Sequence, residues 1–172
     1  MIGNDSNPSK DTEDVLLDVV GLKTYYETLR GYVKAVDNVN LRIRRKEALG
    51  LVGESGCGKS TLALTLMRLL PSNGKVMDGM VLFDGEDILN MKEDRFRKEY
   101  RWKRIAMVFQ GAMNALNPVY RVGDQIAEAI LEHENVTKGE AIERARELLS
   151  LVGVDPDRVK SYPHELSGGM KQ

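Results

Sequence analysis

The stretch that decides the fold is Gly53-Glu54-Ser55-Gly56-Cys57-Gly58-Lys59-Ser60-Thr61, which fits the pattern G-x-x-x-x-G-K-[ST]. Glycines let a backbone wrap tightly, with its N–H groups pointing inward around a polyanion. The lysine adds a point charge for the outer phosphates, and the next hydroxyl can ligate magnesium. The stretch therefore predicts a polyphosphate site.

The residues on both sides of this loop support the prediction. Residues 48–52 are apolar and short enough for a buried strand, and residues 59–70 place leucines on one helical face. The positive end of the helix dipole would then face the phosphate. A glycine-rich turn without a ligand is the alternative, but it would leave several backbone amides unpaired.

Composition limits the class of protein. The chain has 172 residues, of which 42% are hydrophobic and 30% charged, as expected for a globular domain rather than a disordered chain. The formal net charge of −1 gives no electrostatic reason to expect nucleic acid as a partner. Cys57 is the only cysteine, so an internal disulfide is excluded and a reducing compartment is expected. No apolar run approaches the roughly 18 residues that a membrane span needs.

The residues before and just after the loop favour strands. Residues 1–14 are polar and acidic, so we expect a flexible tail. Residues 15–26 and 32–44 predict two strands joined by a hairpin turn at 27–31. The basic residues 44–46 are interpreted as a solvated turn, with a ligand site as the alternative.

The middle of the chain alternates apolar and charged segments. Residues 81–85 predict a strand that ends in an Asp-Gly turn. Residues 91–104 are dense in charge and predict a solvated helix face, or alternatively a partner surface. The apolar residues 105–109 predict a second buried strand, which ends at Gln110.

The last third predicts helices. Residues 126–131 place apolar side chains on one helical face, and residues 141–152 form a second apolar stripe. Thr137 and Glu140 have the spacing of a capping box before this second helix. Gly153 is the expected stop at its C-terminal end.

Three stretches, in this order and spacing, resemble the ATP-binding subunits of ABC transporters. They are the phosphate loop, Val108-Phe109-Gln110 and Leu166-Ser167-Gly168-Gly169-Met170. Residues 114–118 and 162–172 are similar to the dipeptide/oligopeptide (peptide/nickel) uptake branch, and the resemblance covers about residues 15–172. It implies an α/β fold, the N-terminal part of an ABC-type P-loop NTPase.

The resemblance also implies how this fold is divided. We expect a tail at residues 1–14 and a β subdomain plus P-loop core at 15–110, with an antiparallel sheet and an incomplete RecA-like parallel sheet. An α-helical subdomain at 111–172 would end in the signature turn.

The family's site residues map onto matching positions here. The resemblance implies that Lys59 and the backbone amides of residues 54–61 hold the phosphates of ATP. Ser60 and Gln110 would ligate Mg²⁺, Gln110 would also contact the attacking water, and Thr61 would reach an inner phosphate.

Two further contacts with ATP are implied. Ser167, Gly168 and Gly169 match the signature turn, which in the family meets the terminal phosphate of ATP held by a second, head-to-tail protomer. A serine N-cap followed by close-approach glycines is chemically suited to an anion. Tyr26 would stack on adenine, with Tyr25 as the alternative, although strands favour tyrosine for packing as well.

The implied function is to couple ATP binding and hydrolysis to peptide import. The implied partners are membrane-spanning permease subunits, a second ATP-binding subunit in a homo- or heterodimer and, indirectly, a substrate-binding protein. The implied location is peripheral, at the cytoplasmic face of the cell membrane. Nucleic acid is not an expected partner.

The chain departs from the family in three ways. Lys46 stands where glycine is usual, so we expect a looser turn or a left-handed lysine. Met170 replaces the more frequent glutamine. The sequence as given ends at Gln172, before the family's magnesium-holding aspartate, catalytic glutamate and switch histidine. We therefore expect this 172-residue chain to bind nucleotide with little turnover and to associate through exposed apolar surface.

Other functions remain open at this point. A small P-loop kinase or GTPase would not need residues 166–170, and a GTPase would need an Asn-Lys-x-Asp guanine reader, which the sequence lacks. A soluble ABC-type ATPase not linked to transport is disfavoured by the peptide-branch residues 108–118. A truncated nucleotide-binding module without activity is the third alternative.

Overall fold

The computed structural model describes residues 14–109, 111 and 115–172. The chain divides into two compact units, Met1–Ile105 and Ala106–Gln172. The predicted tail lies almost wholly outside the described residues. The first unit contains the sheet and the phosphate loop, and the second is helical.

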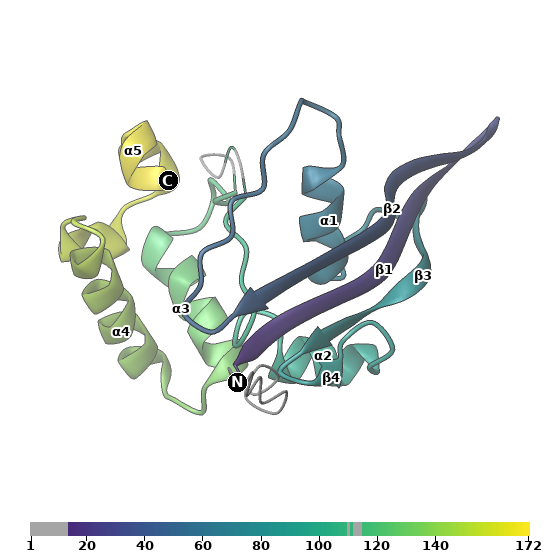
Figure 1. Cartoon of the computed structure of the whole chain (residues 1–172). Coiled ribbons are helices and arrows are strands. Elements are labelled where there is room, and N and C mark those ends of the chain that lie inside the picture. Colours follow the sequence, from purple (N-terminus) through teal and green to yellow (C-terminus); the bar gives the residue numbers. More distant parts are fainter. Residues whose placement is uncertain (1–13, 110, 112–114) are drawn as a thin grey trace, which may run out of the picture. The chain divides into compact units, whose positions relative to one another are not determined.

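The first unit is built on a four-stranded antiparallel sheet with the order β2-β1-β3-β4 (Figure 1). Its strands are β1 (Val15–Thr28), β2 (Gly31–Arg44), β3 (Gly74–Phe83) and β4 (Glu86–Asp87). The predicted hairpin between the first two strands is confirmed, with a turn of residues 29–30. Its long strands alternate apolar and polar side chains, which suits a sheet that buries one face.

An irregularity in β1 decides which side chains face inward. The register between β1 and β2 shifts between Val19 and Leu22, where Gly21 has a φ of 59°. Before this point Val19 is buried, and after it Leu22 and Thr24 are buried. A bulge moves the inward set by one residue, so the even-numbered residues of the second half of β1 face the core.

The turn between β3 and β4 is the predicted Asp-Gly turn. Asp84 and Gly85 have φ values of 53° and 81°, as a two-residue hairpin of this hand requires. The carboxylate of Asp84 accepts hydrogen bonds from the guanidinium groups of Arg45 and Arg104. Arg45 therefore pairs at the sheet turn, which supports the interpretation of residues 44–46 as a turn rather than a ligand site.

Two helices accompany the sheet. Helix α1 (Lys59–Leu66) lies against one face of the sheet, and α2 (Glu93–Glu99) follows β4 (Figure 1). α1 is shorter than the predicted 59–70 because Arg68 takes a left-handed conformation with a φ of 52°, which ends a helix. Strands, α1 and the segment after β4 share one buried core, made of Leu17, Val19, Leu22, Val36, Leu62, Val81, Phe83, Ile88, Phe96 and Tyr100.

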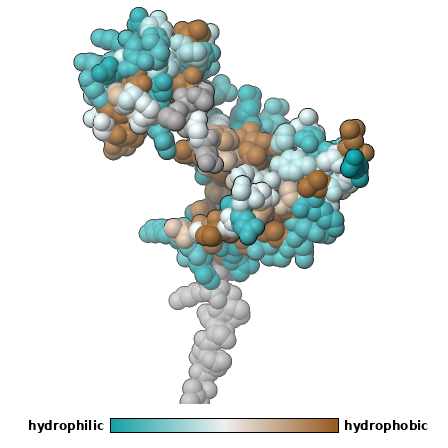
Figure 2. Space-filling model, turned by 90° about the horizontal axis from the view of Figure 1, so that it is seen from above, coloured by the Kyte–Doolittle hydropathy of each residue, from teal (hydrophilic) through white to brown (hydrophobic). Residues whose placement is uncertain are grey.

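The two predicted buried strands, residues 48–52 and 105–109, are wrong for this structure. Residues 48–52 and 106–109 belong to no strand, Ile105 forms only an isolated bridge with Arg101, and Val52 and Val108 are 95% and 84% exposed. A buried parallel strand needs hydrogen-bonded neighbours, and all strands among the described residues belong to the antiparallel sheet. Figure 2 shows hydrophobic patches on a mainly hydrophilic surface.

Lys46 adopts the left-handed conformation that its position suggested, with a φ of 62°. The left-handed backbone conformation costs a residue with a Cβ atom about 1 kcal/mol of folding free energy, and glycine avoids that cost because it has no Cβ. Lys46→Gly is expected to raise the free energy of unfolding by about 0.5–1 kcal/mol. Urea unfolding followed by the fluorescence of Trp102, the only tryptophan, measures the change.

Lys103→Gly is the matched control, because Lys103 is equally exposed but does not have a positive φ. Glycine at position 103 would only raise the conformational entropy of the unfolded chain. Because this entropy is lost on folding, the substitution should lower the free energy of unfolding. A Lys46→Gly variant that lost as much stability as Lys103→Gly would contradict the prediction.

The second unit contains α3 (Val122–His133), α4 (Lys138–Leu151) and the short α5 (Gly168–Lys171). Two 3-10 helices, Pro156–Lys160 and Pro163–Glu165, lie between α4 and α5. Apolar residues of α3 and α4 pack together, as the two predicted stripes require. None of the helices in the described part of the chain is long and apolar enough to cross a membrane.

Both predicted ends of α4 are confirmed. Thr137 Oγ1 accepts from the Glu140 N–H at 3.3 Å, and the Glu140 carboxylate accepts from the Thr137 N–H at 2.7 Å. This hydrogen bond from the Thr137 N–H lowers the pKa of Glu140 the most. A second hydrogen bond, from the Thr137 hydroxyl to the same carboxylate, lowers the pKa further. Gly153 has a φ of 76° just beyond the helix, in the position where glycine commonly terminates helices.

Candidate functional site

The phosphate loop turns through two glycines and rests on β2. Gly56 and Gly58 have φ values of 82° and 97°. A Cβ atom at Gly58 would lie 2.1 Å from the carbonyl oxygen of Ala35. No side chain fits there, so this glycine lets β2 support the loop directly.

The ammonium group of Lys59 lies across the mouth of the loop. Its Nζ atom donates to the carbonyl oxygens of Gly53 at 2.7 Å and Glu54 at 2.6 Å, and lies 3.4 Å from Cys57 Sγ. An ammonium has three protons, and sulfur is only a weak acceptor. Two protons therefore fix the charge in place, and the third is available to a stronger acceptor such as a phosphate oxygen.

The N-terminal end of α1 has free hydrogen-bonding capacity. Its N-cap is Gly58, which gives no side-chain cap, and no acidic residue lies in the first turn. The first amides of a helix have no partner within the helix. Together with the helix dipole they form a site for an anion, next to the Lys59 ammonium.

One of the two predicted magnesium ligands lies among the described residues. Ser60 lies exposed in the first turn of α1, whereas Gln110 lies outside the described residues. Among the residues that the structure describes, no three His, Cys, Asp or Glu side chains gather to hold a metal. Mg²⁺ commonly keeps waters and binds phosphate oxygens, so a single hydroxyl beside a phosphate site suits it.

The two candidate tyrosines lie on opposite faces of the sheet. The hydroxyl of Tyr26 lies 3.2 Å from Thr61 Oγ1 in the first turn of α1. Tyr25 instead donates to Asp37 at 2.6 Å, which raises the pKa of Tyr25 and lowers that of Asp37. Only Tyr26 therefore lies beside the phosphate loop. The hydroxyl of Thr61, which is predicted to reach an inner phosphate, contacts Tyr26 in this structure.

A second pair of side-chain hydroxyls fixes α1 on the sheet. Thr24 Oγ1 and Thr65 Oγ1 lie 3.1 Å apart, and both residues are almost completely buried. Thr65 also donates to the carbonyl oxygen of Thr61 at 2.7 Å. Buried hydroxyls that satisfy one another define the position of a helix more narrowly than apolar contacts do.

In the second unit, the signature residues form the beginning of α5. Ser167 is its N-cap, and Ser167 Oγ accepts from the N–H of Met170 at 3.4 Å. No atom lies within 4 Å of a Cβ built on Gly169, so a ligand could approach the backbone there. The expected serine N-cap is confirmed, and its contact with a phosphate stays a prediction.

One cluster of side chains was not predicted from the sequence. Arg68, Glu93, Phe96 and Arg101, which we call the α1 clamp, meet at the C-terminal end of α1. Residues 91–104 were interpreted as a solvated face, yet the Arg101 side chain is only 12% exposed. Phe96 and Tyr100, four residues apart within the charged run, were the signal that one face of this segment packs inward.

Comparison with known proteins identifies the family. The sequence matches the ABC transporter family over residues 36–172. The chain belongs to this family.

The similar proteins include ATP-binding proteins of peptide transporters. The chain is 47% identical over 170 residues to the "Probable peptide ABC transporter ATP-binding protein y4tR" of Sinorhizobium fredii, covering 97% of this chain and 50% of that protein. It is 44% identical over 161 residues to the oligopeptide transport ATP-binding protein OppD of Escherichia coli, covering 92% and 47%. The chain thus spans about half the length of the curated relatives it matches.

Solved structures support the same fold. The dimeric structure of MJ0796, a bacterial ABC transporter cassette, has a TM-score of 0.74 at 25% identity and covers 90% of this chain and 65% of that one. CbiO1 of Clostridium perfringens has a TM-score of 0.69 at 27% identity, covering 92% and 58%. MJ0796 bound to ADP and Pi also has a TM-score of 0.74, at 24% identity, which shows the fold alone. The sheet and helices described above are the N-terminal part of an ABC ATPase fold.

Proposed function

We propose that this chain binds Mg-ATP as part of an ABC subunit that couples ATP binding and hydrolysis to peptide import. The observation that carries the proposal is the Lys59 ammonium, fixed by the carbonyl oxygens of Gly53 and Glu54 beside an uncapped helix end. This arrangement offers a charge and several amides to one polyphosphate. The relatives described as ATP-binding proteins support nucleotide as the ligand.

The adenine base would stack on Tyr26. Its placement beside Thr61 brings an aromatic ring close to the phosphate loop, whereas Tyr25 is bound to Asp37 on the other face. Ser60 would hold Mg²⁺ together with phosphate oxygens and water. When bound, the metal would neutralise part of the negative charge of the phosphates. Gln110 is the second protein ligand in this proposal.

The proposed partners follow from the relatives. Two protomers would bind ATP between them head to tail, each placing its Ser167–Gly169 turn on the other's phosphate, and the dimeric cassette among the neighbours supports this. The peptide transport proteins among the relatives support membrane-spanning permease subunits as further partners of this chain, and a substrate-binding protein as an indirect partner. We place the protein peripherally at the cytoplasmic face of the membrane.

Titration with a fluorescent ATP analogue and Mg²⁺ tests the proposal. Wild-type chain is expected to bind, and Lys59→Ala is expected to bind about 100-fold more weakly, since a hydrogen bond to a charged group contributes about 1.5–3 kcal/mol. Competition with unlabelled ATP establishes that the nucleotide itself is bound. No saturable binding by folded wild-type protein would overturn the proposed function.

Tyrosine variants in the same titration distinguish the two candidates for the base. Tyr26→Ala should weaken ATP binding about tenfold, because stacking of a base on an aromatic ring contributes about 1–3 kcal/mol. Tyr25→Ala is the matched control on the opposite face and should bind like wild type. The reverse result would assign adenine to Tyr25.

A further inference from the structure

The C-terminal end of α1 is held by a guanidinium group from outside the helix. Arg101 donates through Nε to the carbonyl oxygen of Met67 at 3.3 Å and through Nη2 to that of Arg68 at 3.2 Å. The last carbonyls of a helix lack partners within the helix and carry partial negative charge. Arg101 therefore supplies both hydrogen bonds and charge where this short helix ends.

Arg68, which follows the C-cap residue of α1 in the chain, also stabilises the C-terminal end of this helix. It occupies the left-handed position after the helix, where glycine is preferred, and its N–H donates to the carbonyl oxygen of Thr65 at 3.0 Å. Its guanidinium donates to the carbonyl oxygens of Ile88 at 3.2 Å and Met91 at 2.7 Å. These bonds offset the backbone strain and tie α1 to the segment between β4 and α2.

α2 joins the two arginines into one unit. The Glu93 carboxylate lies 3.1 Å from Arg68 Nη2 and 3.0 Å from Arg101 Nη2. Both guanidinium groups also lie over the ring of Phe96, at 5.0 and 5.2 Å from its centroid. The carboxylate and the ring offset the repulsion between two neighbouring cations, so the two guanidinium groups can lie close together.

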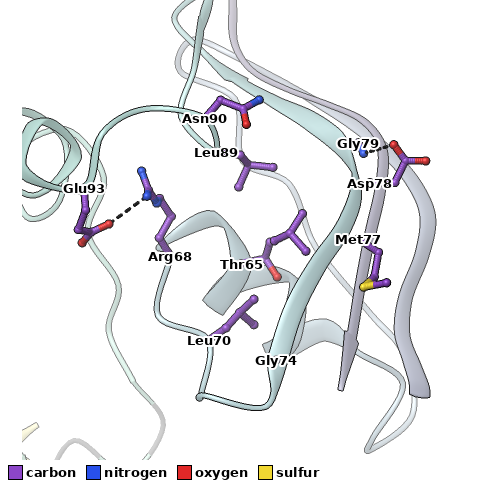
Figure 3. A pocket seen from close by; sticks show the side chains of 11 residues that line it. Thr65, Arg68, Leu70, Gly74, Met77, Asp78, Gly79, Leu89, Asn90 and Glu93 are labelled. Carbon is purple, nitrogen blue, oxygen red and sulfur yellow. Dashed lines mark hydrogen bonds and ion pairs between the residues drawn. The ribbon is translucent and has the colours of Figure 1, made fainter. Parts of the chain in front are cut away.

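A cavity lies beside the C-terminal end of α1. It has a volume of about 550 Å³ and is lined by Thr65, Arg68 and Leu70 on one side and by Met77 and other residues of β3 on the opposite side (Figure 3). The Arg68–Glu93 ion pair lies at its border (Figure 3). On this side the end of α1 borders the cavity, and Thr65 connects it to the sheet through Thr24.

We propose that Arg101 is a positioning residue for phosphate binding, acting through Arg68, Glu93 and α1. The inference rests on the proposed function, because it assumes that the N-terminal end of α1 binds a polyphosphate. α1 has eight residues and is therefore about 12 Å long. A rigid rod of this length transmits any tilt at its clamped end to the Lys59 ammonium and the first-turn amides.

The test compares Arg101→Ala, Arg101→Lys and wild type, with Mg-ATP and with tripolyphosphate as probes. Each titration is corrected for the folded fraction, which Trp102 fluorescence reports. Arg101→Ala is expected to bind both probes about three- to tenfold more weakly. The factor should be the same for ATP and for tripolyphosphate, because the substitution affects only the groups of α1 that bind phosphate and not those that would bind adenosine. Arg101→Lys should recover part of the loss, since lysine restores the charge but not the forked hydrogen bonds.

Arg95→Ala is the matched control. Arg95 lies on α2, is half-exposed and pairs with Glu86 and Glu99 rather than with α1; its loss should leave both affinities unchanged. A purely structural role for Arg101 would lower stability but leave the affinity of folded molecules at the wild-type value, and that result would overturn the inference. If Arg101→Ala does not fold, wild-type affinity in Arg101→Lys would overturn it as well. Failure of wild type to bind either probe would refute the proposed function instead.

Discussion

Gly58→Ala is expected to lower the free energy of unfolding by about 3 kcal/mol or more and to abolish nucleotide binding. The added Cβ would meet the carbonyl oxygen of Ala35 at 2.1 Å, and the φ of 97° disfavours any side chain. The loop would have to move away from β2, which would shift the Lys59 ammonium and the first amides of α1 from their present positions. Urea unfolding and the ATP-analogue titration measure the two effects.

Gly56→Ala provides a control within the same loop. Gly56 also has a positive φ, of 82°, but a Cβ there would have no neighbour within 4 Å. The substitution therefore adds only backbone strain, about 1 kcal/mol. Equal losses of stability in the two variants would show that the contact with β2 does not govern the position of the loop.

Phe96→Ala should cost about 3–5 kcal/mol of the free energy of unfolding, as is usual for a large aromatic residue in a core. Phe96 is fully buried and stacks on Tyr100 with 6.0 Å between ring centroids. The substitution opens a cavity and also removes the ring that faces Arg68 and Arg101. Unfolding in urea, followed by circular dichroism, gives the change.

Tyr32→Ala is the control for this loss. Tyr32 is also an aromatic residue of the first unit, but it is half-exposed and contacts Tyr25 on the sheet surface. Its removal should cost well under 1.5 kcal/mol. If Phe96→Ala were as mild, the α1 clamp would not belong to the core of this unit.

Sequence reasoning succeeded where structure depends on neighbouring residues. The hairpin, the Asp84-Gly85 turn and the capping box of Thr137 and Glu140 are confirmed, because each is set by residues a few positions apart. The left-handed Lys46 was one of two stated possibilities and is the one observed. In the loop, the glycine-lysine pattern and the leucine spacing that follows it placed Lys59 at the start of a helix, as the structure shows.

The failures concern partners that are distant in sequence. An apolar run such as residues 48–52 predicts that a segment can form a strand, but not which segment pairs with it, and here none of the described strands does. Charge density likewise predicted a solvated face for residues 91–104. It could not show that Arg101 would reach the carbonyl oxygens of Met67 and Arg68, since those lie more than thirty residues earlier.

The position of Cys57 has a practical consequence. It is the chain's only thiol, it is exposed, and its sulfur lies 3.4 Å from the Lys59 ammonium. A maleimide dye would therefore attach at one place, inside the loop, with no competing cysteine to remove. Protection of that thiol from the dye by a bound molecule would report occupancy of the loop in the unmutated chain, without any engineered label.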